Sequence, residues 1–379
     1  MYEREKDLRK VFFVIPALHG GGAERVVLNI SKFIDRNKFE PVVVLFKKKG
    51  EFLPEISPDV RLEVLDAKFM VPLRLMRLLK REQPDALVSF MWYTNFIVLS
   101  SRILSGLKCR VIVNERSELS LSYKNQLKEM LRRMIIHFLY RYSDKIIANS
   151  SIMGFQLKKM LRRLSEKVAV IYNPVDIQMI SGMSFSEVEH SWFKEEAPII
   201  ISAGRLSVEK GFSYLLKSMS ILATEGTDCR LVILGKGKED DGLRSLASEL
   251  GINNKIAFMG FQENPYKYLA NSTIFVLSSL YEGFPNVLLE AMALGVPSVA
   301  TRCLTGPEEI IVDGVNGLLV PPADEKELAD AIKRLLNDED LRRRLGEAGR
   351  KRAEDFRADR IVSQYEKVIE DVCAESADR

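Results

Sequence analysis

The feature that most constrains the fold is a repeated alternation of short β-branched runs with amphipathic, helix-like stretches. Seven such runs precede residue 175 and five more follow residue 195: VFFVI, PVVVLF, RLEVL, DALVSF, CRVIVN, KIIANS and VAVIYN, then PIIISAG, CRLVILG, KIAFMG, STIFVLSS and PSVAT. Because parallel strands need crossover connections, this alternation predicts open parallel sheets with helices on both faces. A chain of 379 residues exceeds what one hydrophobic core usually supports, so we expect two α/β domains in tandem.

The stretch from 173 to 197 contains no strand-like run and marks the boundary. We therefore expect an N-terminal domain over 1–176 and a C-terminal domain over 177–356. Residues 357–379 carry apolar side chains at helical spacing and predict a final helix: Ile361, Val362, Tyr365, Val368 and Ile369. Ligands of such sheets bind beyond the carboxyl ends of the strands, so the chemistry is expected just after each strand.

Composition excludes several classes of protein. No segment approaches the ~20 consecutive apolar residues of a transmembrane helix, and the N-terminal MYEREKDLRK lacks the apolar core of a signal peptide, so we expect a cytoplasmic protein. The four cysteines form no CxxC pair, and the three histidines are scattered. We therefore expect neither a structural zinc nor another metal site.

The charge is divided unevenly along the chain. Residues 1–176 hold 32 lysines and arginines against 19 acidic residues, a net +13, and the remainder carries −9. A basic first half predicts an anionic partner. Since no nucleic-acid-binding motif accompanies the charge, we expect no nucleic acid.

Two basic segments of the first half indicate what that partner is. In residues 124–141 one helical face collects Leu127, Met130, Leu131, Met134, Ile135 and Phe138, with Lys124, Lys128, Arg132 and Arg133 on the other side; residues 156–164 add Lys158, Lys159, Arg162 and Arg163. Such a helix commonly packs its apolar face on the core and leaves its basic face in solvent. Two of them in so basic a domain lead to the hypothesis of peripheral attachment to an anionic membrane surface.

The run GRLSVEKG follows a strand of the second domain directly. Arg205 and Lys210 lie five residues apart in a loop bounded by Gly204 and Gly211. A forked guanidinium and a compact ammonium at a strand's carboxyl end are suited to clamp a diphosphate. The alternative is a pair of solvated surface residues.

A second motif, LYEGFPNVLLEAM, follows a later strand of the same domain. Pro285 favours the first turn of a helix, whose free N–H groups would face the ligand. Glu282 precedes that helix and Glu290 lies just over one turn inside it. Because carboxylates there would repel an anion, we expect them to accept hydrogen bonds from sugar or ribose hydroxyls. The alternatives are loop solubility for Glu282 and a favourable helix-terminal charge for Glu290.

The run ALHGGGAER joins the first strand to the first helix. Three consecutive glycines there suit either a flexible turn or a close approach of the backbone, at Gly21 and Gly22, to a ligand.

Three motifs, in this order on two α/β units, resemble those of a retaining glycosyltransferase of family 4: GGAER, GRLSVEKG and EGFPNVLLE. The resemblance covers nearly the whole chain. It implies the GT-B fold: two Rossmann-like, doubly wound parallel-sheet domains that face a central cleft, with a C-terminal helix that crosses back to the first domain. It also implies transfer from a nucleotide sugar with retention of the anomeric configuration, usually without a metal ion.

The resemblance implies roles for individual positions. Arg205 and Lys210 match the pair that holds the donor diphosphate, Glu282 the carboxylate that contacts the donor sugar, and Glu290 the one that binds the ribose. Other matched positions are the glycine loops at Gly21, Gly22 and Gly204, the base-binding strand end near Phe261, and the phosphate-facing backbone of Phe284, Pro285, Asn286 and Val287. Without a DxD-like carboxylate pair, stabilisation of the leaving diphosphate is expected to come from these cations and backbone dipoles.

One position departs from the family pattern. Many members carry a histidine at the end of an N-domain strand, where this chain has Asn114, Glu115 and Arg116. Glu115 and Arg116 resemble a Glu-Arg pair seen in a polysaccharide-building subset and are candidates for sugar or acceptor contacts. Their alternative is an internal ion pair.

The sequence therefore predicts a glycosyltransferase that moves a hexose or N-acetylhexosamine from a nucleotide sugar, UDP-linked, to a lipid-linked or glycan acceptor of a surface polysaccharide. It would act at the inner face of the cell membrane and need no cofactor. One alternative is a catalytically silent nucleotide-sugar-binding protein. The other, an NAD-dependent oxidoreductase, lacks the third glycine of GxGxxG in residues 20–25.

Overall fold

The computed structural model describes residues 8–66, 70–116 and 126–374, and within the helix that starts at 126 it describes side chains from residue 130. The chain forms two compact units. Unit 1 combines residues 1–174 with 358–379, and unit 2 comprises residues 175–357.

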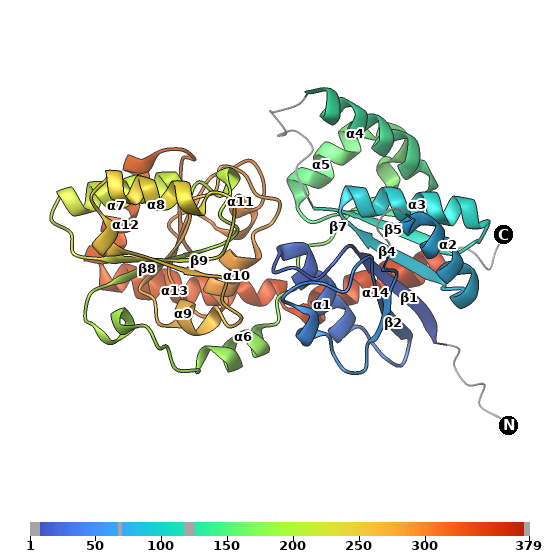
Figure 1. The fold of residues 1–379 in the computed structure, drawn as a ribbon, viewed down its shortest axis with the longest axis horizontal. Coiled ribbons are helices and arrows are strands. Elements are labelled where there is room, and N and C mark those ends of the chain that lie inside the picture. The colour runs from blue at the N-terminus through green and yellow to red at the C-terminus, as the bar shows by residue number, and fades with distance from the viewer. Residues whose placement is uncertain (1–7, 67–69, 117–125, 375–379) are drawn as a thin grey trace. The chain divides into compact units, whose positions relative to one another are not determined.

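Unit 1 contains a parallel sheet of seven strands in the order β3-β2-β1-β4-β5-β6-β7 (Figure 1). All seven strands expected for the first half of the chain are present: β1 (Arg9–Ile15), β2 (Phe39–Leu45), β3 (Arg61–Val64), β4 (Ala86–Phe90), β5 (Arg110–Glu115), β6 (Lys145–Ala148) and β7 (Val168–Val170). The order reverses between β1 and β4, which makes a topological switch point beyond their carboxyl ends.

Helices cover both faces of this sheet (Figure 1). One face carries α2 (Val71–Glu82), α3 (Trp92–Ser105), α4 (Gln126–Leu139) and α5 (Ser151–Met160), and the other carries α1 (Gly22–Phe33) and α14 (Ala358–Ala374). The final helix α14 buries the apolar positions Ile361, Val362, Tyr365 and Ile369 within unit 1. Because both faces are covered, β1 reads as an almost continuous apolar run with five fully buried residues from Val11 to Ile15.

Unit 2 contains a second parallel sheet, in the order β10-β9-β8-β11-β12-β13. Its strands are β8 (Ile199–Ala203), β9 (Arg230–Leu234), β10 (Ile256–Gly260), β11 (Ile274–Leu277), β12 (Ser298–Thr301) and β13 (Leu318–Val320). Five of them are the strands expected from the sequence. The sixth, β13, was not predicted, because its short run Leu318–Val320 holds one β-branched residue and is followed directly by two prolines. The switch point of this sheet lies between β8 and β11.

The helices of unit 2 also form two layers (Figure 1). α7 (Phe212–Thr224), α8 (Asp240–Glu249) and α12 (Glu325–Asn337) lie over one face, and α9 (Tyr266–Ala270), α10 (Asn286–Ala293) and α13 (Glu339–Ala353) lie over the other. Two further helices, α6 (Ile177–Ser184) and α11 (Pro307–Ile310), complete the unit. Among the described residues, no helix has both the length and the apolar character that crossing a bilayer requires.

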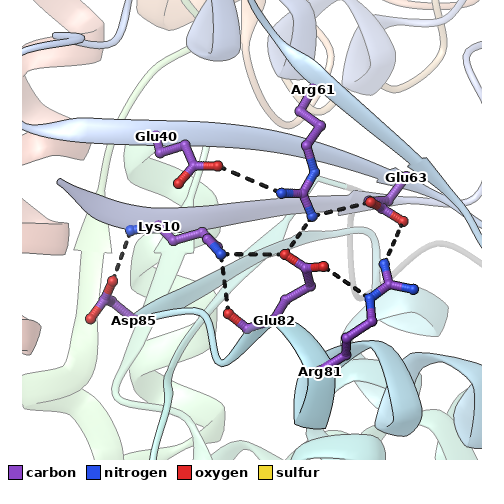
Figure 2. A network of polar contacts seen from close by, with 7 residues as sticks. All are labelled: Lys10, Glu40, Arg61, Glu63, Arg81, Glu82 and Asp85. Carbon is purple, nitrogen blue, oxygen red and sulfur yellow. Dashed lines mark hydrogen bonds and ion pairs between the residues drawn. The ribbon is translucent and has the colours of Figure 1, made fainter.

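The amino-terminal edge of the unit 1 sheet is held by an ion-pair network centred on Glu82 (Figure 2). The Glu82 carboxylate accepts hydrogen bonds from Arg81 and Lys10 and pairs with Arg61 of β3. The bond from Arg61 is the main cause that lowers the pKa of Glu82 from 4.5 to about 2, and its side chain is 14% exposed. These residues lie at the edge opposite the switch point, so we assign them to stability.

This network predicts a pH dependence of stability. Because the folded pKa of Glu82 is depressed, its contribution is fully present above pH 4.5 and is lost as the pH falls through 2. We expect Glu82→Gln to lower the free energy of unfolding by about 1–2 kcal/mol at neutral pH, with the difference vanishing toward pH 2. Urea unfolding at a series of pH values measures it. Glu166→Gln, an exposed glutamate of unit 1, is the control; equal pH profiles for the two variants would contradict the assignment.

Candidate active site

The candidate site of unit 2 lies at the switch point, where two loops follow the adjacent strands β8 and β11. The loop after β8 is Gly204–Gly211 and the loop after β11 runs from Ser278 to Pro285. Both predicted motifs therefore emerge at one edge of one sheet, in the place where ligands of open α/β sheets bind.

The two loops are joined by an ion pair. The Lys210 ammonium donates to Oε1 of Glu282 at 2.6 Å, and the Ser279 hydroxyl donates to the same oxygen at 2.6 Å. Glu282 is 8% exposed and the Lys210 side chain 23%. Oε2 of Glu282 makes no hydrogen bond with any described residue. The carboxylate thus holds the ammonium in place through one oxygen and keeps the other for a further donor.

Backbone contacts fix the two loops against each other. The Leu280 N–H donates to the Glu209 carbonyl at 2.8 Å, and the Ser278 hydroxyl donates to the Lys210 carbonyl at 3.0 Å. Gly211 is left-handed, with φ of 62°, and a Cβ at that position would lie 2.1 Å from the Ser278 carbonyl oxygen. Gly211 is therefore required for this close approach.

Helix α10 begins at Asn286, close to the predicted start near residue 285, but Pro285 is its extended N-cap and not part of its first turn. Pro285 provides no side-chain cap for the first turn, and the Leu288 N–H donates to the Pro285 carbonyl at 3.2 Å. The Phe284 side chain is buried against Phe356, with ring centroids 5.5 Å apart, so its backbone is the part available to a ligand. Asn286, Val287 and Glu290 are half-buried on the first turns of α10.

The remaining candidates of unit 2 lie around this pair. Arg205 is exposed, and its guanidinium makes no hydrogen bond or ion pair within the described part of the chain. Gly204 lies beside the Lys210 side chain, since a Cβ there would be 3.8 Å from its methylene groups. Phe261 follows β10, the edge strand of the sheet, and is half-buried.

A third loop supports the site, and the sequence did not predict it. The Thr305 hydroxyl donates to the Glu282 carbonyl, and Thr301 donates to the Ser279 carbonyl. Gly306, with φ of 87°, would place a Cβ 2.8 Å from the Pro285 ring. Burial, assisted by the Glu282 charge, raises the pKa of the neighbouring Cys303 thiol to about 12 and keeps it protonated. The pair Thr305-Gly306 was the sequence signal that could have indicated this loop, since glycine favours a turn.

In unit 1 the glycine loop follows β1 at the other switch point. Helix α1 begins at Gly22 with Gly21 as its N-cap, in extended conformation with φ of −109°. Gly20, Gly21 and Gly22 all lack positive φ, so the triplet is not explained by a left-handed turn. A Cβ on Gly21 would lie 2.6 Å from a carboxylate oxygen of Glu24. Because this carboxylate is the flexible end of a side chain, the contact does not require glycine, and the close-approach role of the loop stays a prediction.

Glu115 and Arg116 are both engaged inside unit 1. Glu115 is fully buried, accepts a hydrogen bond from the Tyr140 hydroxyl and lies 3.6 Å from the Arg132 guanidinium. Arg116 donates to Asn173 at 2.6 Å and to the Tyr365 hydroxyl of α14 at 3.0 Å. Burial lowers the pKa of Arg116 and raises the pKa of Tyr140. This geometry favours the internal ion-pair alternative for Glu115.

Helix α4 is oriented differently from the common arrangement. Ile136 of α4 and Tyr140, in the short 3-10 turn Tyr140–Tyr142 that follows it, face the core, as does Arg132, whose side chain is 12% exposed. Four residues of the predicted apolar face are more than half exposed, at 54–61%: Met130, Leu131, Met134 and Phe138. A fifth, Ile135, is half-buried. We call these four residues, with the exposed Arg133 and Arg141, the α4 surface. Lys124 and the side chains of Leu127 and Lys128 lie outside the described residues.

The second basic segment does have the common arrangement. Leu157 and Leu161 are buried, whereas Lys158, Lys159, Arg162 and Arg163 are exposed. Across the described residues, no cluster of three or more histidines, cysteines or carboxylates could hold a metal ion.

The turn after β4 is a feature that sequence reasoning missed. Met91 has φ of 74° and ψ of 140°, a combination of backbone angles that residues other than glycine rarely adopt. Such strain costs about 1–3 kcal/mol and clusters at binding sites. The residue type carries no signal for it, because methionine has no preference for positive φ.

Comparisons with known proteins identify the family. Residues 20–179 match the family described as Glycosyltransferase Family 4, and residues 186–352 match Glycosyl transferases group 1. The chain belongs to glycosyltransferase family 4. This glycosyltransferase is 30% identical over 361 residues to a Campylobacter jejuni protein, covering 92% of this chain and 96% of the relative. That relative is named N-acetylgalactosamine-N,N'-diacetylbacillosaminyl-diphospho-undecaprenol 4-alpha-N-acetylgalactosaminyltransferase.

Solved structures show the fold of this glycosyltransferase. Anabaena HepE, in complex with UDP and glucose, superposes with a TM-score of 0.82 at 21% identity. The match covers 96% of this chain and 100% of HepE. Sucrose-phosphate synthase from Thermosynechococcus elongatus also has a TM-score of 0.82, at 19% identity, with 97% and 100% covered. The predicted GT-B class, with two doubly wound parallel sheets, is confirmed.

Proposed function

We propose that this glycosyltransferase moves a hexose or N-acetylhexosamine from a UDP-sugar to a lipid-linked glycan acceptor, with retention of the anomeric configuration and without a metal ion. The observation that carries the donor half is the Lys210–Glu282 pair at the unit 2 switch point, with the exposed Arg205 in the same loop. An anionic diphosphate flanked by hydroxyl-bearing rings fits cations beside a carboxylate.

Each of these residues has a separate role in the proposed transfer reaction. Arg205, Lys210 and the N-terminal dipole of α10 stabilise the negative charge that develops on the departing diphosphate. The free oxygen of Glu282 accepts a hydrogen bond from a donor-sugar hydroxyl, and Glu290 accepts from the ribose. The anomeric carbon–phosphate oxygen bond breaks, the acceptor oxygen bonds to that carbon, and the acceptor proton passes to the leaving phosphate.

Names of relatives support the acceptor half. The Campylobacter relative at 30% identity acts on a diphospho-undecaprenol-linked sugar, as does a second one at 26% identity over 96% of this chain. A Rhizobium meliloti relative, at 26% identity, is named for lipopolysaccharide core biosynthesis. We infer a prenyl-diphosphate-linked acceptor of surface polysaccharide synthesis, met at the cytoplasmic face of the cell membrane.

Nucleotide release across a panel of donors tests this function. The chain is incubated with a short prenyl diphosphate that carries N-acetylgalactosamine and with one of four donors: UDP-glucose, UDP-galactose, UDP-N-acetylglucosamine or UDP-N-acetylgalactosamine. We expect one donor to release UDP in an acceptor-dependent way, with an anomeric configuration in the product that equals that of the donor. Donor binding without release would favour the catalytically silent alternative, and an inverted product would refute retention.

Membrane attachment through the basic domain is part of the proposal, and the α4 surface gives it a location. Four apolar side chains more than half exposed on one helix contribute to binding when they leave water, at about 1.5–3 kcal/mol for each side chain fully buried. Arg133 and Arg141 flank them, and each basic residue near an anionic surface adds about 1 kcal/mol. An apolar stripe between cations fits the interface of an anionic bilayer.

We expect Met134→Glu to weaken binding to anionic vesicles at least about tenfold, because it removes an inserting side chain and adds a repelled charge. Sedimentation with vesicles that contain phosphatidylglycerol measures this. Phe185→Glu, in unit 2, replaces a side chain that is 85% exposed and should leave binding unchanged. Equal binding of the wild-type chain to neutral and anionic vesicles would refute the membrane proposal.

A further inference from the structure

The switch point of unit 1 is flanked by two loops, as is that of unit 2. One is the glycine loop after β1. The other, which we call the turn Met91–Tyr93, follows β4, the strand that pairs with β1; Met91 is the N-cap of α3, and Trp92 and Tyr93 are the first two residues of that helix. In unit 2 the turn in the equivalent place, after β11, carries Glu282. The turn after β4 therefore occupies a ligand-binding position of its sheet.

This turn is held firmly in its strained conformation. The Met91 N–H donates to the Asn114 carbonyl at 3.2 Å, and the Asn95 N–H donates to the Met91 carbonyl at 2.9 Å. The Asn95 side chain, fully buried, donates to the Asn114 carbonyl at 3.0 Å and accepts from Ser89 at 2.7 Å. These bonds fix the direction in which the residues after Met91 leave the strand.

Two aromatic side chains follow directly. The rings of Trp92 and Tyr93 meet edge to face, with centroids 6.0 Å apart and planes at 77°. Trp92 is half-buried and packs on the core, and the Arg132 guanidinium lies 5.7 Å from its ring centroid. Tyr93 is 53% exposed. An immobilised tryptophan thus orients a tyrosine ring that is open to solvent.

We propose that the turn Met91–Tyr93 binds a pyranose ring of the acceptor, with Tyr93 as the stacking platform. The C–H groups on one face of a pyranose are apolar and pack against an aromatic face, and the Tyr93 hydroxyl offers a hydrogen bond to the ring substituents. The inference rests on the proposed function, because it identifies the acceptor as a glycan. A ring held in advance also loses little entropy on binding.

Fluorescence of Trp92 tests the site without any transfer reaction. The chain has two tryptophans, so Trp192→Phe leaves Trp92 as the reporter. This full-length variant is titrated with the methyl α-glycosides of N-acetylgalactosamine, N-acetylglucosamine, galactose and glucose. We expect a saturable change with at least one glycoside, weakened about fivefold or more in Kd by Tyr93→Ala and less than about twofold by Tyr93→Phe.

Leu104→Ala, at the other end of α3 and 65% exposed, is the matched control and should leave Kd unchanged. Absence of saturable binding for every glycoside, or equal Kd for the parent and Tyr93→Ala, would overturn the inference. A prenyl diphosphate without sugar forms a second arm. If Tyr93→Ala weakens that ligand and no glycoside, the turn recognises the lipid diphosphate and the inference is wrong. Glycoside binding by a chain that releases no nucleotide would instead refute the proposed function alone.

Discussion

Replacing Lys210 with alanine is expected to lower the transfer rate about 100- to 1000-fold, the usual effect of removing one group that stabilises developing charge. The ammonium lies 2.6 Å from Glu282, beside the α10 N-terminus, where the diphosphate of the proposed donor departs. Its loss should reduce kcat more than it raises the donor KM, because the charge it neutralises grows as the bond breaks. Steady-state kinetics with the donor selected by the panel measures both constants.

Folding and catalysis must be separated in this experiment. Lys210→Ala leaves the Glu282 carboxylate, 8% exposed, without its cation, which destabilises unit 2 by about 1–3 kcal/mol. The double variant Lys210→Met with Glu282→Gln removes both charges and should recover the stability but not the rate. Lys217→Ala, which breaks an exposed pair with Glu325 at 3.9 Å, is the matched control and should retain full activity. Full activity in the double variant would show that the pair is structural.

The parts of the fold that could be predicted from sequence are those with a local signal. Runs such as VFFVI and PVVVLF predicted their strands because strands covered on both faces are almost entirely apolar. Strand β13 was not predicted because Leu318–Val320 holds one β-branched residue and is followed by two prolines, whereas the equally short β7 lies in the β-branched run VAVI. Helix α4 shows a different limit. Its spacing predicts an apolar face, but the direction in which that face turns depends on contacts with distant residues, such as the pair of Arg132 with the buried Glu115.

The candidate site follows the same rule. Arg205, Lys210 and Glu282 were predicted because glycines, charges and strand ends occur together in short motifs. Their pairing across the two loops was not predicted, since a contact between residues 210 and 282 depends on the strand order. The support from Thr305 and the strain at Met91 were missed for related reasons. One is a hydrogen bond to a distant carbonyl, and the other is a backbone angle that the residue type does not reveal.

Gly211→Ala is expected to lower the free energy of unfolding by about 2–5 kcal/mol. A left-handed conformation costs an alanine about 1–2 kcal/mol, and the close contact adds strain of about 1–3 kcal/mol. That contact is with the Ser278 carbonyl oxygen, 2.1 Å from the new Cβ, and a backbone atom has little freedom to move away. The melting temperature should fall by roughly 5–15 °C, which thermal unfolding followed by circular dichroism measures.

The same substitution should also impair donor binding. To relieve the contact, the loop after β8 must move away from β11, which separates Lys210 from Glu282 and stretches the bond between Ser278 and the Lys210 carbonyl. We expect the Kd for UDP, measured by calorimetry, to rise at least about tenfold. Gly226→Ala isolates the cost of backbone conformation, because Gly226 has φ of 76° and no described atom lies within 4 Å of where its Cβ would be. It should lose about 1–2 kcal/mol of stability and bind UDP normally. If the two variants are equally stable and bind UDP equally well, then contact between the loops does not hold the site together.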